Sequence, residues 1–283
     1  MTDGPRLGVL ASRVRYEEKQ IMAALDRRGA ACTLLDPRSL FVAGTWTGPD
    51  VVLNREVGHF RALYAASALE SAGAVVLNSA AATHLSGDKW HTSAALAAMG
   101  LPTPRTALAA APEAALAALE ELGYPAVVKP LVGSWGRLVT RLPDRDTAEA
   151  VLEHVAALPG PQSHVIYLQE LMSTADRDIR VVVIDGQALG ATYRRGSQWR
   201  TNVARGATSE PCDLAPEVAK LAVAAADAVG ADIAGVDLIE DTDGRLVVLE
   251  VNDRVEFRGF QSAHPGVDVA DAMAGLLIRR ARS

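Results

Sequence analysis

The chain has 283 residues, 49% of them hydrophobic, which is enough for two compact lobes with cores of their own. Its net charge of −6 argues against a nucleic-acid-binding surface, which usually brings a basic excess. Cys32 and Cys212 show no metal-ligand spacing, and no apolar run approaches the roughly 20 residues of a membrane helix. We therefore expect a soluble cytoplasmic protein that binds neither nucleic acid nor membrane.

The first part of the chain alternates strand and helix patterns. The helices, at about 17–28 and 60–72, end at glycines, as helices often do. Short apolar strands are predicted between them, at 6–11, 31–35, 51–53 and 75–77. This order favours a small parallel α/β unit with helices packed on its sheet.

The rest of the chain mixes helices with strand pairs. A helix at 88–100 ends at Leu101-Pro-Thr-Pro104, where we expect a lobe boundary. A second lobe is predicted from helices at 112–123 and 147–158 and strands at 125–130, 137–142 and 165–168. A third is predicted from a helix at 216–229 and two hairpins, 178–184 with 187–193 and 233–240 with 246–251. These lobes indicate an α+β arrangement after the α/β unit.

A glycine-rich segment, Gly133-Ser-Trp-Gly136, lies between two predicted strands. A Walker-type phosphate loop needs a helix after it and a Gly-Lys-Ser/Thr ending, and this segment has neither. A hairpin loop can instead cover a triphosphate and donate backbone N–H groups, with Lys129 adding charge from the preceding strand. The alternative is a plain hairpin turn.

An acidic cluster is predicted on the last hairpin. Glu250 and Asn252 share one face of their strand because side chains alternate, and the Asp241-Thr-Asp-Gly244 turn brings Asp237 close to them. Such hard oxygen ligands suit Mg²⁺. A solvated hairpin face carries similar residues, so this alternative stays open at this point.

Arginines and one further lysine complete the candidate set. Guanidinium groups bind phosphates and carboxylates bidentately. Some of the five arginines on or near the strand pair 178–184 and 187–193 are therefore candidates to hold an acyl phosphate and an anionic substrate. Lys89 begins a helix from which it would reach a phosphate. Each of these residues has the alternative of an ordinary solvated surface group. The five arginines are Arg180, Arg194, Arg195, Arg200 and Arg205.

The order of these motifs resembles one protein family. Val-Lys-Pro130 precedes Gly-Ser-Trp-Gly-Arg137, and Thr-Asn-Val-Ala-Arg-Gly206 precedes Val-Asp-Leu238 and Glu-Val-Asn252. The chain resembles ATP-grasp ligases related to the ribosomal-protein glutamate ligase. It resembles most closely the LysX/ArgX (RimK-like) enzymes, which join an amino acid to the small acidic carrier protein LysW. The similarity runs over nearly the whole chain.

The resemblance implies an ATP-grasp fold with an N-terminal parallel α/β pre-ATP-grasp domain. It implies this domain at 1–88, a subdomain with the Gly-rich loop at 89–172, and a C-terminal subdomain with the Mg²⁺ site at 173–283. We further expect a homo-oligomer, either a dimer or a tetramer.

The resemblance also assigns site residues by position. Arg180 and Arg194 would be catalytic, and Asp237, Glu250 and Asn252 would hold Mg²⁺ as two ions. The amino-acid substrate would contact Val203, Ala204, Glu256, Phe257, Arg258, Gly259 and Phe260. ATP would contact Lys89, Lys129, Gly133, Ser134, Trp135, Gly136, Arg137, Gln169, Glu170, Leu171, Met172, Asp178, Arg194 and Asn202.

The run that ends at Phe260 bears on the substrate. In the family, Asn-Ser or Asn-Thr after the Glu-Phe accompanies α-aminoadipate, whereas Gly-Phe accompanies glutamate, and this chain has Gly259-Phe260. The two substrates differ by one methylene, which a pocket distinguishes by only ~1–3 kcal/mol, and a bulky Phe260 would shorten the pocket. The alternative is that Phe260 is a core aromatic.

The resemblance therefore implies ligation of the α-amine of glutamate to the γ-carboxylate of a carrier's C-terminal glutamate. The reaction would proceed through an acyl phosphate, in arginine, lysine or specialised-metabolite synthesis. Three alternatives stay open: an α-aminoadipate–LysW ligase, a ribosomal-protein-type glutamate ligase, and an ATP-sensing scaffold without turnover.

Overall fold

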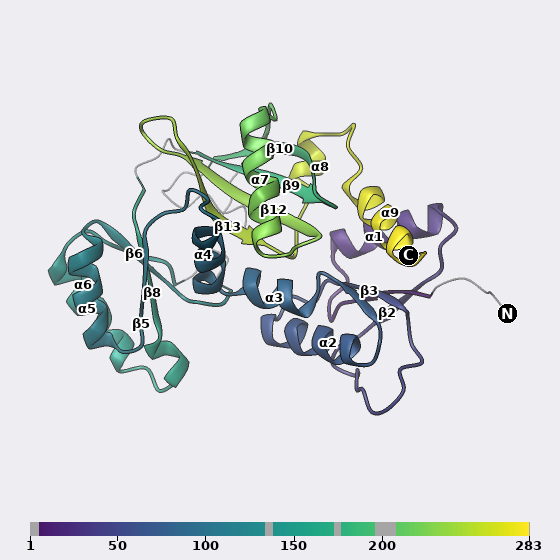
Figure 1. Cartoon of the computed structure of the whole chain (residues 1–283), viewed down its shortest axis with the longest axis horizontal. Coiled ribbons are helices and arrows are strands. Elements are labelled where there is room, and N and C mark those ends of the chain that lie inside the picture. The colour runs from purple at the N-terminus through teal and green to yellow at the C-terminus, as the bar shows by residue number, and fades with distance from the viewer. Residues whose placement is uncertain (1–5, 134–137, 173–176, 196–207, 283) are drawn as a thin grey trace.

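The computed structural model describes residues 6–133, 138–172, 177–195 and 208–282. The strands within these ranges form three sheets, each in its own region of the molecule (Figure 1). The first is parallel and the other two are antiparallel, which confirms the predicted α/β unit followed by α+β lobes.

The N-terminal sheet has the order β2-β1-β3-β4, with every pair parallel. Because side chains alternate along each strand, Val9 and Leu53 face the core beneath helix α1, whereas Leu10 and Val52 face the core beneath α2. Buried strands of this kind need helices on both faces. The elements are β1 (Leu7–Leu10), α1 (Tyr16–Arg27), β2 (Cys32–Leu35), β3 (Val51–Asn54), α2 (His59–Ser71) and β4 (Val75–Leu77).

The C-terminal end of the described chain returns to this first sheet. Helix α9 (Val269–Arg280) lies beside α1, and Met273 and Leu277 share a core with Val9 (Figure 1). The short helix α8 (Arg258–Ala263) contributes Phe260 to the same core. Neither helix was among the predicted elements.

The middle sheet has the order β5-β8-β6-β7. The antiparallel pairing of β6 with β7 confirms the hairpin predicted around Gly133, whereas the edge strand β5 was not predicted. Helices α5 and α6 bury Leu119 and Leu152 with Leu142 and Leu168 of the sheet. The elements are β5 (Thr106–Ala109), α5 (Pro112–Leu122), β6 (Ala126–Lys129), β7 (Thr140–Leu142), α6 (Arg145–Ala156), η1 (Pro161–His164) and β8 (Ile166–Glu170).

The third sheet has the order β11-β10-β9-β12-β13, and both predicted hairpins are present in it. The alanine-rich face of α7 packs Ala222 and Ala226 against Val181 and Val236, while Val182 points to the core shared with the first sheet. Strand β11 was not predicted. The elements are β9 (Arg177–Ile184), β10 (Gln187–Arg195), β11 (Thr208–Cys212), α7 (Pro216–Ala228), β12 (Ile233–Glu240) and β13 (Leu246–Asn252).

Helix α4 (Lys89–Ala98) lies where the middle and third sheets meet (Figure 1). The Asp88 carboxylate caps it by accepting from Trp90 N and His91 N at 2.9 and 3.2 Å. Its last turn buries Leu96 against the third sheet. A separate helix, α3 (Ala80–Gly87), precedes it and was not predicted.

Asn78 connects the first sheet to the third. This buried side chain follows β4, donates to the carbonyl oxygens of Ile233 and Asp253 at 2.7 and 2.8 Å, and accepts from Ile233 N at 2.9 Å. Ile233 begins β12 and Asp253 follows β13, so one amide holds both open ends of the hairpin that carries the predicted metal ligands.

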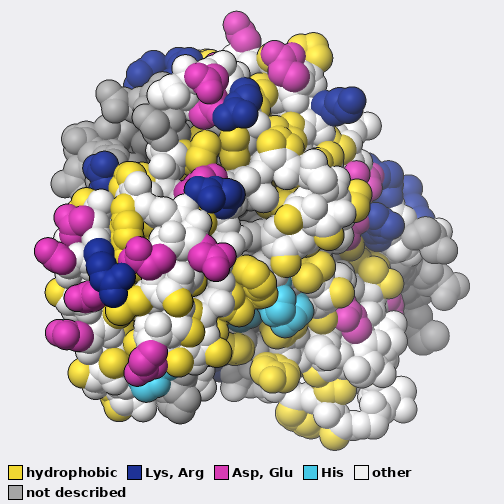
Figure 2. Space-filling view, turned by 60° about the vertical axis from the view of Figure 1, so that its left-hand side comes forward, with side chains coloured by type: hydrophobic (Ala, Val, Ile, Leu, Met, Phe, Trp, Pro, Cys, Tyr) yellow, Lys and Arg dark blue, Asp and Glu magenta, His cyan; other side chains and the backbone are white. Residues whose placement is uncertain are grey.

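The surface carries mixed charge on the face seen after a 60° turn (Figure 2). Acidic and basic side chains are interspersed over most of the described part of that face. No helix in the described ranges combines the length and the apolar character that crossing a bilayer requires.

Candidate active site

The β12–β13 hairpin brings the three predicted metal ligands together. Asp237 lies opposite Glu250, and Asn252 lies opposite Gly235, with a bulge directly after Asp237. The Asn252 amide nitrogen lies 3.5 Å from Asp237 Oδ2. The cluster inferred from period two and from the turn is therefore a spatial cluster.

Two arginines contact Asp237 from the neighbouring strands. Arg180 lies opposite Asp237 across the β9–β12 ladder, and its Nη2 is 3.0 Å from Asp237 Oδ2. Arg194 Nη2 lies 3.0 Å from the same oxygen, and its Nε and Nη2 also bind Asp178 at 2.6 and 2.8 Å. Both predicted catalytic arginines thus lie beside the metal-ligand cluster.

Arg194 is the more deeply placed of the two, with 7% of its side chain exposed. Burial on its own would lower the pKa of Arg194, but the carboxylates of Asp237 and Asp178 outweigh burial and raise it above its ordinary value. Arg194 therefore stays charged at any pH at which the protein is folded.

The donors on this hairpin fit Mg²⁺. Asp237, Glu250 and Asn252 offer carboxylate and amide oxygens, and the Glu250 side chain is 31% exposed and so open to a ligand. No group of three or more His, Cys, Asp and Glu side chains suited to a metal occurs in the described ranges. Two carboxylates and an amide are few ligands, which is typical of Mg²⁺ sites completed by water and substrate phosphate.

Lys89 points into the same place from the first residue of α4. Its ammonium donates to the Gly133 carbonyl oxygen at 2.8 Å and lies 3.4 Å from Glu250 Oε1. The backbone holds this arrangement, because Lys89 N donates to Leu131 O at 2.9 Å. With 12% of its side chain exposed, Lys89 is not a solvated surface lysine.

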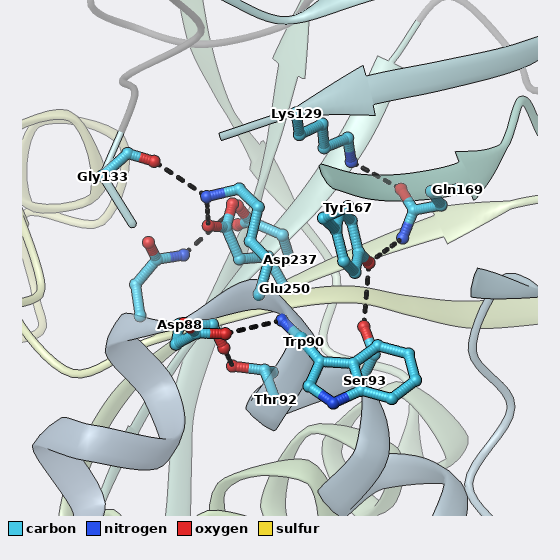
Figure 3. Close-up of polar contacts among 12 residues, drawn as sticks. Asp88, Trp90, Thr92, Ser93, Lys129, Gly133, Tyr167, Gln169, Asp237 and Glu250 are labelled. Carbon is cyan, nitrogen blue, oxygen red and sulfur yellow. Dashed lines mark hydrogen bonds and ion pairs between the residues drawn. The ribbon is translucent and has the colours of Figure 1, made fainter. Parts of the chain in front are cut away.

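Lys129 enters from β6 and begins a buried chain of hydrogen bonds (Figure 3). Its ammonium donates to Gln169 Oε1, Gln169 Nε2 donates to the Tyr167 hydroxyl at 3.0 Å, and that hydroxyl lies 2.9 Å from Ser93 Oγ. Burial lowers the pKa of Lys129 to about 8, with nearby Glu250 opposing the shift and Lys89 adding to it.

The remaining residues of the predicted hinge have structural partners. Glu170 accepts from Arg105 N at 2.8 Å and from Arg105 Nε at 3.0 Å, and Leu171 N donates to Pro125 O at 3.1 Å. Met172 is half-buried beside them. These contacts join the end of β8 to the start of β5 and to the residues just before β6.

The predicted substrate run begins close to α1. Glu256 forms an ion pair with Arg15 Nη1 at 2.7 Å, while Phe257 is fully buried with its ring edge-on to Tyr16, 6.2 Å between centroids. The Arg258 guanidinium lies 5.4 Å from the Tyr16 ring centre. Three of the five predicted residues are thus held by the N-terminal domain.

Gly259 and Phe260 are closely packed. A Cβ on Gly259 would meet Ser209 Oγ at 2.6 Å. Phe260 is 3% exposed, stacks on His264 at 4.8 Å between centroids, and would lie 2.9 Å from a Cβ on Gly190. Its placement is that of a core aromatic, the second of the two interpretations considered above.

Among the other candidates, Arg195 forms an exposed ion pair with Glu210 at 3.1 Å, and the rest lie outside the described ranges. Conversely, Tyr167 and Ser93 contact the site but were not predicted. Tyr167 lies two residues before Gln169 and so on the same face of β8, and Ser93 is one helical turn after Lys89, so spacing was the only available signal. The residues outside are Ser134, Trp135, Gly136, Arg137, Arg200, Asn202, Val203, Ala204 and Arg205.

Comparison with known proteins matches this architecture. A RimK-like ATP-grasp domain matches residues 86–277, and a LysX preATP-grasp domain matches residues 7–85. A RimK domain ATP-grasp protein from Sphaerobacter thermophilus is 29% identical with a TM-score of 0.80, covering 95% of this chain and 98% of its own.

Two curated relatives match over most of their lengths. The glutamate–LysW ligase ArgX of Sulfolobus acidocaldarius is 32% identical over 95% of this chain and 96% of its own length. The α-aminoadipate–LysW ligase LysX of Sulfurisphaera tokodaii is 30% identical over 89% of this chain and 91% of its own. Together with the paired lysines and the carboxylate hairpin, these matches show that the chain belongs to the RimK-like ATP-grasp family of ligases, with a LysX-type preATP-grasp domain.

Proposed function

We propose that the protein uses ATP and Mg²⁺ to join the α-amine of glutamate to the C-terminal glutamate of a small acidic LysW-type carrier protein. The observation that carries the proposal is the convergence of Lys89, Lys129 and Arg180 on the carboxylates of Asp237 and Glu250. Cations and oxygen ligands from two sheets and one helix meet here, as binding of a metal triphosphate requires.

The nucleotide phosphates would lie between the two lysines and the hairpin. Lys89 and Lys129 supply positive charge, and the peptide groups near Gly133 would cover the phosphates. Mg²⁺, in two ions held by Asp237, Glu250 and Asn252, would neutralise charge on the transferred phosphoryl group.

The reaction would run in two steps that need no side-chain nucleophile. A carboxylate oxygen of the carrier attacks the γ-phosphorus of ATP, forming an acyl phosphate and releasing ADP from that phosphorus. The glutamate amine then attacks the acyl carbon, loses a proton and expels phosphate. Arg180 and Arg194 would hold the acyl phosphate, so that positioning and charge supply most of the acceleration.

Glutamate is the proposed amino acid because this chain has the Gly259-Phe260 pair that accompanies glutamate in the family, and because the ArgX relative is a glutamate–LysW ligase. The buried ring of Phe260 adds no support of its own, since it lies in the core. The second candidate substrate is α-aminoadipate, which the LysX relative uses and which differs by one methylene. As chain segments we assign 1–88 to the pre-ATP-grasp domain and 89–172 and 173–283 to the two ATP-grasp subdomains. We also propose a homo-oligomer, to be tested by light scattering.

The test is to incubate the protein with ATP, Mg²⁺ and a purified LysW-type carrier, with either glutamate or α-aminoadipate, and to weigh the intact carrier. We expect the carrier to gain one glutamyl residue, and a carrier without its C-terminal glutamate to gain none. A mass gain with α-aminoadipate alone would refute the substrate. ATP consumption that ignores both carrier and amino acid would refute the ligase and favour the ATP-sensing scaffold.

A further inference from the structure

The Lys129 ammonium is held by buried side chains of β8 and α4. Its ammonium donates to Gln169 Oε1, and the Gln169 side chain is almost fully buried, at 2% exposure. Behind Gln169 stand Tyr167 and Ser93, which are 1% and 5% exposed. Figure 3 shows that an unbroken chain of hydrogen bonds joins Lys129, Gln169, Tyr167 and Ser93.

The amide of Gln169 can serve this chain of hydrogen bonds in one orientation only. An amide has an acceptor at one end and two donors at the other. If it were rotated by half a turn, its NH₂ group would face the Lys129 ammonium, donor against donor, and its oxygen would face the Tyr167 hydroxyl. Because the Lys129 ammonium can only donate, it requires the oxygen, and the NH₂ group is then held in place by the Tyr167 hydroxyl, which accepts from it.

Ser93 holds the Tyr167 hydroxyl in turn. A phenol that accepts from Gln169 still has its own hydrogen, and Ser93 Oγ at 2.9 Å is positioned to receive it. Ser93 lies four residues after Lys89 on α4, so one face of this helix orients both lysines. The helix carries Lys89 itself, and its Ser93 acts on Lys129 through Tyr167 and Gln169.

We propose that Tyr167 and Ser93 are positioning residues for nucleotide binding, which fix the Gln169 amide so that its oxygen faces and supports the charged form of Lys129. The inference rests on the proposed role of Lys129 in binding nucleotide phosphate. It extends the site to two residues whose hydrogen bonds run to Gln169 and to each other.

The test is calorimetric binding of MgADP between about pH 7 and 10, with no carrier or amino acid present. Affinity in the wild type should fall as pH rises through the Lys129 titration, because the neutral amine attracts phosphate less. In Tyr167→Phe the Gln169 NH₂ group loses its acceptor, so MgADP should bind about 5- to 20-fold more weakly at neutral pH. The pH at which affinity falls should also move down by about one unit.

Ser93→Ala should also weaken MgADP binding and lower the pH at which the affinity falls. The shift in pH should be about half of that in Tyr167→Phe, because the Tyr167 hydroxyl is still present but has lost one hydrogen-bond partner. Two matched controls remove the same atoms elsewhere. Ser86→Ala removes a buried hydroxyl on α3 that donates to Ala82 O, and Tyr124→Phe removes a phenol 3.4 Å from Glu120. Both should leave the affinity and its pH profile unchanged.

Lys129→Met tests the nucleotide-binding role of this lysine separately from the positioning role of Tyr167 and Ser93. It should weaken MgADP binding by about 30-fold or more and abolish the pH dependence above neutrality. Unchanged binding in Lys129→Met would overturn the nucleotide role of that lysine. Weak binding in Lys129→Met together with a wild-type pH profile in Tyr167→Phe would overturn the positioning role alone. The same conclusion would follow if Tyr167→Phe lost thermal stability and MgADP affinity without any shift of the pH profile.

Discussion

The proposed metal and phosphate end of the site and the predicted amino-acid run are held by different forces. At the first, Asp237, Arg180 and Arg194 form a largely buried set of charges with hydrogen bonds near 3 Å. At the second, Phe257 and Phe260 are anchored in an apolar core. The stability that buried charges contribute depends steeply on their partners, whereas that of apolar packing depends on the volume of the side chains. The two ends should therefore respond differently to substitution.

The largest effect is expected where two adjacent arginines point to opposite faces of β10. Arg194→Gln leaves Asp178 and Asp237 buried without their shared cation and should cost about 3–5 kcal/mol of unfolding free energy. Arg195→Gln removes only an exposed pair with Glu210 and should cost less than about 1 kcal/mol. Urea unfolding of both variants measures the difference, and equal losses would contradict the charge-held description of this end.

Glu250→Gln should reduce turnover by about 100-fold, because it removes a proposed anionic metal ligand and the partner of Lys89. Phosphate release with carrier and glutamate present gives the rate. Asp243→Asn, on the exposed turn of the same hairpin, is the matched control and should stay within about twofold. A loss of less than about fivefold in Glu250→Gln would place the metal elsewhere.

Lys129 should make stability depend on pH in a defined direction. Its pKa is lowered from 10.5 to about 8, so between these values the unfolded chain binds a proton that the folded chain has lost. Unfolding free energy therefore rises with pH in this window. Relative to Lys129→Met, the nucleotide-free wild type should gain about 1–2 kcal/mol between about pH 7 and 9.5 in urea titrations. A constant difference would show that Lys129 is not buried as described.

The smallest effect is expected in the amino-acid run. Gly259→Ala places a methyl group against Ser209 and should cost about 1 kcal/mol, with the side chain of Ser209 yielding in part. Ser209→Gly should restore at least half of that loss, measured as a double-mutant cycle in unfolding free energy. Additive losses would mean that the two residues do not touch and that packing does not hold this end.

Periodicity and turns were sufficient for much of the fold and for the core of the site. The alternation of Asp237, Glu250 and Asn252 across an Asp-Gly turn predicted a cluster that the strand register contains. The parallel first unit was also predictable, because its short apolar strands alternate with helices ending at glycines.

Sequence patterns could not predict which side chains from distant parts of the chain pair with one another. Nothing local indicates that Arg180 and Arg194 pair with Asp237, because this depends on which strands are neighbours in the third sheet. The chain of hydrogen bonds from Lys129 to Ser93 joins β6, β8 and α4, whose order in space is a property of the whole fold. Helix α9 was missed although Asp268 caps it, a local signal that was available.

The covering of the first sheet by α9 affects how the chain matures in the cell. Val9 and Leu53 emerge early from the ribosome, but Met273 and Leu277, which cover the same face, are synthesised more than two hundred residues later. Domains made first usually fold first. Here one apolar face of the N-terminal sheet is covered by α1 but not by α9 during most of translation, and the apolar surface that α9 later buries is where chaperones would bind the nascent chain.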